Sequence, residues 1–307
     1  MSVRDKGGAA KLAQSVSLMD PKVDFVFKSL FGDEKHPRIL ISFLNAVFGY
    51  SEKDGTHQHI TKIKIENPHL DKTMVDDKYS VLDIRATLNT EEIVNIEIQI
   101  KSPGSMTNRL LYYLSKMLGN QLCEGESYSK LKRCVSIGVL NFDLIKNQNF
   151  HNKFNFRSDT DKHVLSELLE LHTIELPKLA KQKKLDTSNL LVDWALFLSD
   201  PEGKNTEKLQ KQVPEIKEAM GVLEMLSHDK HARAIYEKRQ QALHDKASAL
   251  QHEREEGKHE GRQEGAHETQ QKIAKKLLQA GVDHAVITTA TGLTAEQIQN
   301  LQKHIAH

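Results

Sequence analysis

The stretch IVNIEIQIKS, residues 93 to 102, alternates between apolar and polar side chains. Valine and isoleucine occupy the even positions from 94 to 100, which predicts a β-strand with two unlike faces. The polar face carries Asn95, Glu97, Gln99 and Lys101. Two interpretations of this face are open: a sheet surface in water, or a site in which a carboxylate holds a metal ion beside a polar helper.

The preceding strand supplies a second carboxylate. Residues 79–88, YSVLDIRATL, also alternate, with Asp83 on the polar face, and NTEE follows as a turn. Opposed residues of an antiparallel pair share a face, so a connection of odd length keeps the two polar faces together. A three-residue connection places Asp83 opposite Glu97, and a five-residue connection shifts the pairing by one step. Either hairpin brings the two carboxylates to one face, roughly 5 Å apart at the Cβ atoms when they are opposed.

Two carboxylates this close repel one another unless a cation lies between them. Mg²⁺ accepts one or two protein carboxylates and completes its coordination with water and phosphate oxygens. It can then polarise a phosphate and activate a water molecule for hydrolysis. Gln99 is placed to orient that water or the phosphate, and Lys101 to balance charge. Alternation by itself does not decide between this site and a water-exposed sheet face.

The other segments place these two strands in an α/β fold. Residues 168–176 are a further strand candidate, and the patterns from residue 190 onward are helical. The resulting order predicts an α/β sandwich with a mixed central sheet flanked by helices. In chain order, the core consists of a broken helix at 20–49, strands at 60–67, 79–88 and 93–100, a helix at 106–122 and a strand at 133–142.

Composition limits the class of protein. The chain has 307 residues and a formal net charge of +1, so a basic surface for nucleic acid must be local. Cys123 and Cys134 lack metal-ligand spacing and form no disulfide framework, which favours a reducing compartment. No apolar run approaches the roughly 20 residues of a membrane span. We therefore expect a cytoplasmic protein without a membrane partner.

Composition also divides the chain along its length. The sequence of the C-terminal module, residues 273–307, predicts short helices with helix-turn-helix spacing. Gly292 makes the turn, and Thr294 caps the last helix. The predicted parts are a disordered tail at 1–18, a globular domain with a helical extension at 19–228, a charged segment at 229–272 and a helical module at 273–307.

The charged segment contains REEGKHEGRQEGAHE, in which Gly257, Gly261 and Gly265 recur every fourth residue. In a helix this spacing aligns the glycines on one stripe where a second backbone can approach. Each interior glycine costs about 1 kcal/mol of helix stability relative to alanine. A helix that is stabilised by pairing and a flexible linker are both compatible with this composition.

The motifs together resemble a known family. Asp83 followed by EIQ at 97–99, in this order of elements, resembles the PD-(D/E)XK nuclease superfamily. The chain is more closely similar to the Rpn family of recombination-promoting nucleases, also called PD-(D/E)XK family transposases. The resemblance extends from Met19 to the C-terminus. The segments that carry it are DPKVDFVFKSLFG, LISFLNAVFG, VLDIRA, NIEIQI, NRLLYYLSKMLGNQLCEGESY, ELHTIEL, EEGKHEGRQEG and TGLTAEQIQNL.

This resemblance implies a DNA endonuclease that depends on Mg²⁺ or Mn²⁺. Asp83 and Glu97 correspond to the metal ligands, and Asp24 on the first helix corresponds to an additional catalytic acid. Gln99 stands where the superfamily motif has a lysine. Because an amide carries no charge, Gln99 can position groups but cannot stabilise negative charge as a lysine does.

The helix at 106–122 follows the site strand and carries Arg109 and Tyr113. With Lys101, these residues are candidates for contact with DNA phosphates. The C-terminal helices are candidates for pairing two chains, since two copies present two sites to the two strands of DNA. An alternative function is a DNA-binding or protein-interaction module with little catalysis, and the sequence leaves cleavage of RNA open.

Overall fold

The computed structural model describes residues 17–50, 59–66, 83–102, 104–182, 185–186 and 188–305. The predicted tail lies outside these residues except at its end, and so do residues 79–82 of the predicted second strand. The chain forms two compact units, residues 1–241 and 242–307.

The first unit contains the sheet, and its helices and strands follow the predicted order as far as β4. One further helix, α9 (Lys230–Gln279), begins in this unit and continues into the second. The elements that precede it are α1 (Asp24–Phe31), α2 (Pro37–Phe48), β1 (Ile63–Ile65), β2 (Ile84–Leu88), β3 (Ile93–Gln99), α4 (Met106–Gly119), β4 (Cys134–Leu140), β5 (His151–Arg157), β6 (Val164–Glu175), α5 (Leu176–Ala180), α6 (Leu190–Ser199), α7 (Thr206–Gln212) and α8 (Pro214–His228).

The sheet formed by the described residues is mixed, as predicted, with the strand order β1-β2-β3-β4-β6-β5. β1, β2 and β3 are antiparallel neighbours, whereas β3, β4 and β6 run parallel. β5, which pairs with β6 at the edge of the sheet, was not predicted from the sequence. This strand, HNKFNFR, is mostly polar, and Phe154 and Phe156 are exposed rather than packed in the core. The prediction of β6 began four residues too late.

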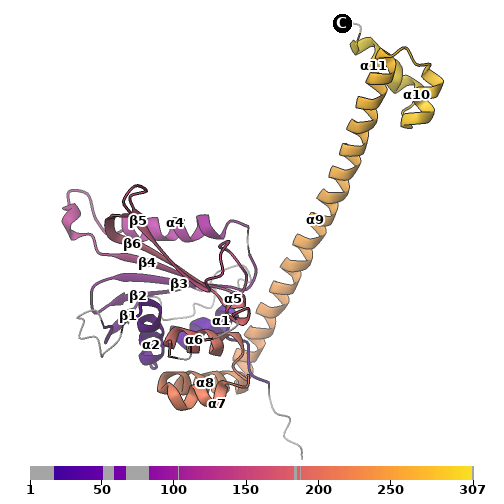
Figure 1. The fold of residues 1–307 in the computed structure, drawn as a ribbon. Helices are drawn as coiled ribbons and strands as arrows, with labels where there is room; N and C mark the ends of the chain where they lie inside the picture. The colour runs from indigo at the N-terminus through magenta and orange to yellow at the C-terminus, as the bar shows by residue number, and fades with distance from the viewer. Residues whose placement is uncertain are drawn as a thin grey trace, which may run out of the picture. The chain divides into compact units, whose positions relative to one another are not determined.

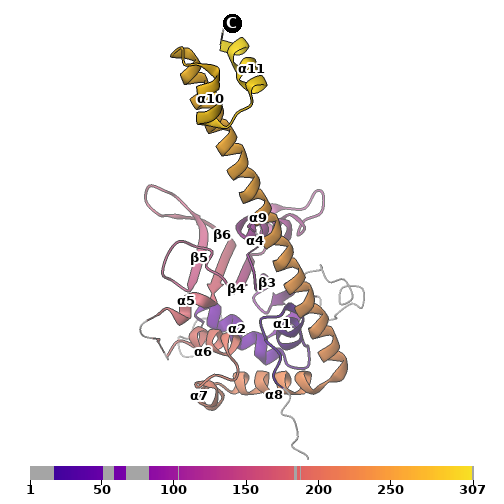
Figure 2. The same cartoon turned by 90° about the vertical axis from the view of Figure 1, so that its right-hand side faces the viewer.

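One face of the sheet is covered by the main core, to which α1, α2, α6 and α8 contribute. Aromatic side chains pack against one another between the helices of this layer. Phe31 lies 4.6 Å from Phe27, 5.1 Å from Phe43 and 5.4 Å from Trp194 between ring centroids. α7 and α8 lie on the side of α6 that faces away from the sheet (Figures 1 and 2). The apolar residues of β2 and β3 point into this layer.

The opposite face of the sheet is covered by α4 (Figure 1). Leu110 of this helix packs over β4 at Gly138, where an added Cβ would lie only 3.1 Å from the Leu110 Cδ1 atom. A glycine at this position therefore allows α4 to approach the sheet closely. Gly138 is the β4 partner of Glu97, so the close approach occurs directly beside the polar face of β3.

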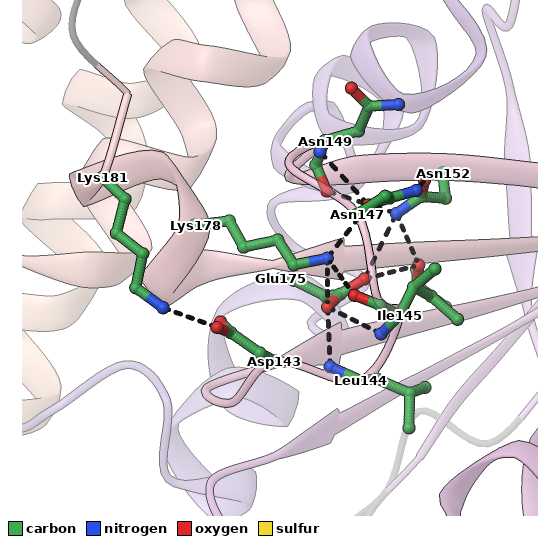
Figure 3. A network of polar contacts seen from close by, with 10 residues as sticks. Asp143, Leu144, Ile145, Asn147, Asn149, Asn152, Glu175, Lys178 and Lys181 are labelled. Carbon is green, nitrogen blue, oxygen red and sulfur yellow. Dashed lines mark hydrogen bonds and ion pairs between the residues drawn. The ribbon is translucent and has the colours of Figure 1, made fainter.

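A buried polar network fixes the connection between β4 and β5 (Figure 3). Glu175, at the end of β6, is fully buried, and its Oε2 accepts hydrogen bonds from the backbone N–H groups of Leu144 at 2.7 Å and Ile145 at 3.1 Å. Lys178 Nζ lies 2.8 Å from the same oxygen and donates to the Ile145 carbonyl at 2.7 Å. Asn152 Nδ2 donates to Glu175 Oε1 at 3.2 Å. The network ties the loop after β4 to the end of β6.

We expect Lys178→Met to lower the free energy of unfolding by about 3–5 kcal/mol, because it leaves the Glu175 carboxylate buried without its cation. Lys181→Met is the matched control. Lys181 pairs with Asp143 at 2.5 Å, but the two side chains are 60% and 45% exposed. Loss of that pair is worth less than about 1 kcal/mol. Urea unfolding of both variants measures the difference, and equal effects would contradict the assignment of Lys178 as the partner on which this loop depends.

The second unit contains the later part of α9, then α10 (His284–Thr291) and α11 (Ala295–Ile305). A small core joins Ala274 of α9 to Ile287, Leu293 and Ile298. Gly292 adopts φ +70° at the end of α10. The Thr294 N–H donates to Gln297 Oε1 at 2.8 Å and the Gln297 N–H to Thr294 Oγ1 at 3.3 Å, a reciprocal cap of the kind that starts helices.

The glycine repeat lies within α9, so in this structure it is helical rather than a linker. Residues 250–269 of the helix are exposed throughout. A Cβ added at Gly257, Gly261 or Gly265 would meet no atom within 4 Å. The described helices include none that is long and apolar enough to cross a bilayer.

Candidate functional site

The β2–β3 hairpin has the register predicted from a three-residue connection. Ile84 pairs with Ile96 and Thr87 with Ile93, and the Leu88 N–H donates to the Glu92 carbonyl at 2.9 Å. Glu91 adopts φ +65°, which closes the short turn. Extending this register by one residue places Asp83 opposite Glu97. The printed register agrees with the predicted three-residue connection, and the pairing of the two carboxylates remains a prediction that follows from this extension.

The polar face of β3 is not a water-exposed surface. Asn95 and Glu97 are each only 1% exposed, because α4 covers this side of the sheet. Arg109 of α4 reaches down so that its Nε lies 2.6 Å from Glu97 Oε1. The N–H is not aligned with that oxygen, so the contact is an ion pair rather than a hydrogen bond. Gln99 Nε2 donates to the same oxygen at 2.9 Å.

The second oxygen of Glu97 has no partner. Its Oε2 is buried and accepts no hydrogen bond from the described residues. Burial raises the pKa of Glu97 above the ordinary carboxyl range, and the nearby charge of Asp83 adds to the rise. The charge of Arg109 and the Gln99 hydrogen bond oppose the rise without cancelling it. A buried carboxylate oxygen in this state is suited to bind a proton or a cation.

Asp83 precedes β2 and is partly buried. Its negative charge acts on Glu97 and also on Lys28 of α1, a buried residue that was not predicted from the sequence. Lys28 is 3% exposed. The available signal was a lysine inside the apolar helix DFVFKSLF, since lysine is almost never fully buried without a functional or structural partner.

The remaining predicted site residues are Asp24, Tyr113 and Lys101. Asp24 lies one turn before Lys28 on α1, and its Oδ2 is 3.4 Å from Arg239 Nη1. Tyr113 supports Arg109, whose guanidinium carbon lies 5.5 Å from the centre of the tyrosine ring. Lys101 is exposed beyond the end of β3. Arg109 is therefore held between Tyr113 and Glu97.

The donor set suits a hard divalent cation. Asp83 and Glu97 offer carboxylate oxygens, and Mg²⁺ is commonly held by one or two carboxylates with water and substrate oxygens in its other positions. Across the ranges that the structure describes, no group of three or more His, Cys, Asp and Glu residues is arranged to hold a metal. Any ion bound here would thus depend on this carboxylate pair, water and substrate for its coordination.

The first unit is an α/β fold with a mixed sheet, and its polar face beneath α4 carries the buried Glu97. A family model described as PD-(D/E)XK nuclease family transposase matches residues 21–253, and the chain belongs to this family. A second model, described as the C-terminal HTH domain of the Rpn/YhgA-like nuclease family, matches residues 267–303. Neither a curated protein nor a solved structure matched the chain. The PD-(D/E)XK family is typically dependent on divalent metal ions.

We expect Glu97→Gln to raise the free energy of unfolding at pH 8 by about 1 kcal/mol in buffer containing a chelator. Because the folded-state pKa of Glu97 is raised, its carboxyl stabilises the fold most when protonated. That contribution is lost as the pH rises from about 4.3 through the folded-state pKa. The glutamine variant avoids this loss, so its advantage should grow between pH 5 and pH 8.

Urea unfolding at several pH values measures the effect. Glu91→Gln is the control, because Glu91 lies in the same hairpin but its side chain is 68% exposed. A Glu97→Gln variant that is less stable than wild type at pH 8 would mean that the Arg109 ion pair outweighs the cost of burial.

Proposed function

We propose that the chain is a DNA endonuclease that hydrolyses phosphodiester bonds with Mg²⁺, or with Mn²⁺ in its place. The observation that carries the proposal is the buried Glu97 carboxylate, one oxygen of which accepts no hydrogen bond from the described residues. The hairpin register, extended by one residue, sets this carboxylate opposite Asp83. Family membership supports nuclease chemistry, and the helix-turn-helix unit supports DNA as the substrate.

Asp83 and Glu97 would hold the ion. When bound, the ion would neutralise charge on the phosphate and lower the pKa of a coordinated water. In the reaction a water oxygen forms a bond to phosphorus, the bond to one ester oxygen breaks, and that oxygen leaves with a proton.

The chain's own residues prepare this site. Gln99 and Arg109 hold one oxygen of Glu97, and the other oxygen, which accepts no hydrogen bond from the described residues, would be available to the ion. α4 keeps water away from the carboxylate, and a low-dielectric site strengthens each of these interactions. Asp24 is proposed as an additional acid near the entrance to the site. Arg109, Tyr113 and Lys101 are proposed to lie along the DNA backbone. Arg109 would then contact both a DNA phosphate and Glu97, one of the two proposed metal ligands.

The C-terminal unit is proposed to contact DNA through α11. Gln297, Gln299 and Asn300 are exposed on this helix, and amide side chains can bond the edges of bases in the major groove. Glu296 on the same helix would repel phosphate, so contact is expected along only part of the helix.

Cleavage of plasmid DNA tests the proposal. We expect the wild-type protein to nick or linearise plasmid with Mg²⁺ and to be inert with a chelator. Glu97→Ala and Asp83→Asn should lower the rate by at least about 100-fold, because each removes a charge on which the transition state depends. Glu91→Gln, the exposed control in the same hairpin, should retain activity.

An alternative function is a DNA-binding or protein-interaction module with little catalysis. The neutral Gln99, in place of a lysine, is the observation that favours it. Inert wild-type and Glu97→Ala proteins that bind the plasmid equally well would support this alternative. Parallel assays on single-stranded and duplex RNA identify the nucleic acid that is cleaved.

We also propose that two chains pair through their C-terminal helices. The glycine stripe of α9 is exposed and open, and so permits close approach of a second helix. Light scattering on the full chain at micromolar concentration should give the mass of a dimer. A monomer under these conditions would contradict the pairing.

A further inference from the structure

A cavity of about 290 Å³ opens between α4 and the strands β5 and β6. Its lining contains no charged side chain and is mostly apolar. The walls include Leu111 and Leu114 of α4, Phe154 and Phe156 of β5, and Leu169 and Leu171 of β6. A cavity of about 150 Å³ is enough to hold benzene, so this one has room for a larger flat ring.

Two aromatic side chains form the β5 wall and are also open to solvent. Phe154 is 41% exposed and Phe156 is 53% exposed. The strand HNKFNFR alternates these rings with polar and basic residues. Sheets that bind unpaired nucleic acid carry aromatic side chains in this way, because every base has a flat face that can stack on a ring.

An irregularity of β5 brings an amide to the same wall. In a regular strand Asn155 would point to the face opposite Phe154 and Phe156. The register of β5 shifts on both sides of Phe156, and Asn155 lines the cavity together with the two rings. Bulges of this kind re-aim side chains at functional sites. Thr107 and Thr173 bring two hydroxyl groups to the lining, so the cavity offers apolar walls to the face of a ring and polar groups to its edge.

Positive charge lies at the mouth of the cavity. Arg157 Nε donates to Asn155 Oδ1 at 2.7 Å, which fixes an exposed guanidinium beside the lining. Lys146 is exposed directly after Ile145, another lining residue. Among the residues with described positions, no carboxylate pairs with Arg157 or Lys146. An apolar peptide has no use for these cations, whereas a base carries a phosphate beside it.

The cavity and the carboxylate site share the start of α4. Thr107 lines the cavity, and Arg109 lies 2.6 Å from Glu97. Across the sheet, Glu97 is the partner of Gly138, and Gly138 is the partner of Thr173. At a strand spacing of about 4.8 Å, Thr173 lies about 10 Å from Glu97 between backbones. One nucleic-acid strand covers that span in about three stacked nucleotides of 3.4 Å each.

We propose that this cavity binds an unpaired base of the nucleic acid that is cut at Glu97. Phe154 and Phe156 stack on the base, Asn155 bonds its edge, and Arg157 contacts the adjoining phosphate. The preferred substrate is thus a nucleic acid with an unpaired nucleotide about three positions from the cut. This inference rests on the proposed nuclease function, because it names the form of that substrate.

Binding of the full chain to a labelled single strand tests this inference. Fluorescence polarisation with a thymidine strand of about 20 nucleotides, in a chelator so that nothing is cut, compares Phe156→Ala with Leu165→Ala. Leu165 is the matched control, because it is an apolar residue of β6 that is 79% exposed and lies outside the lining. We expect Phe156→Ala to weaken the affinity about 10-fold and Leu165→Ala to leave it unchanged. Phe156→Tyr keeps the ring and should bind as wild type does.

A fully paired duplex of the same length separates base stacking from general attraction to phosphate. Phe156→Ala should keep the wild-type affinity for this duplex, because paired bases do not enter the cavity. Equal losses on both probes would overturn the proposal. So would a wild-type chain that does not bind the single strand, or equal single-strand affinities of Phe156→Ala and Leu165→Ala.

Two further outcomes have distinct meanings. If Phe156→Ala changes the mass of the chain in light scattering but not its single-strand affinity, the cavity is an interface between copies and the proposal is overturned. Because binding is measured without metal, failure of the nuclease function remains distinguishable. A chain that leaves plasmid uncut but loses single-strand affinity with Phe156→Ala contradicts the endonuclease and supports the base site.

Discussion

The ion pair between Glu97 and Arg109 joins the two layers on which the site depends. It connects the middle of β3 to the underside of α4, in a position that is 1% exposed at the carboxylate. The contact requires α4 to lie close to the sheet, and Gly138 on the neighbouring strand provides the space. Gly138 therefore affects both packing and electrostatics. It leaves room for Leu110 of α4, and the close approach of this helix buries Glu97 on the neighbouring strand.

Two of the buried carboxylates, Glu97 and Glu170, have surroundings with opposite effects on their pKa. On the other face of the sheet, Glu170 receives Arg133 at 2.7 Å, Lys153 at 2.8 Å and His172 at 2.6 Å, and these contacts lower its pKa to about 2. Glu97 has one cation and one amide, and its pKa is raised. Both are charged groups within one sheet, but only Glu97 retains an oxygen without a partner. This contrast distinguishes a group that stabilises the fold from one that is available to a ligand.

The register of the hairpin was predictable because it depends on local rules. Alternation assigns Asp83 and Glu97 to one face, and an odd connection keeps them together. The burial of that face was not predictable, since it depends on where α4 packs after the chain returns. Lys28 was missed for the same reason: its neighbour Asp83 lies 55 positions away in the sequence. β5 was missed because an edge strand needs little apolar sequence when only one neighbour pairs with it.

The irregular pairing of β5 has a consequence for behaviour in concentrated solution. This edge strand exposes Phe154 and Phe156, a combination that can template intermolecular sheets. Its register shifts on both sides of Phe156, and Lys153 and Arg157 add charge along the same edge. A bulged and charged edge is a poor partner for a second strand. The protein can thus carry exposed aromatic rings at the border of its sheet while resisting growth of that sheet into aggregates.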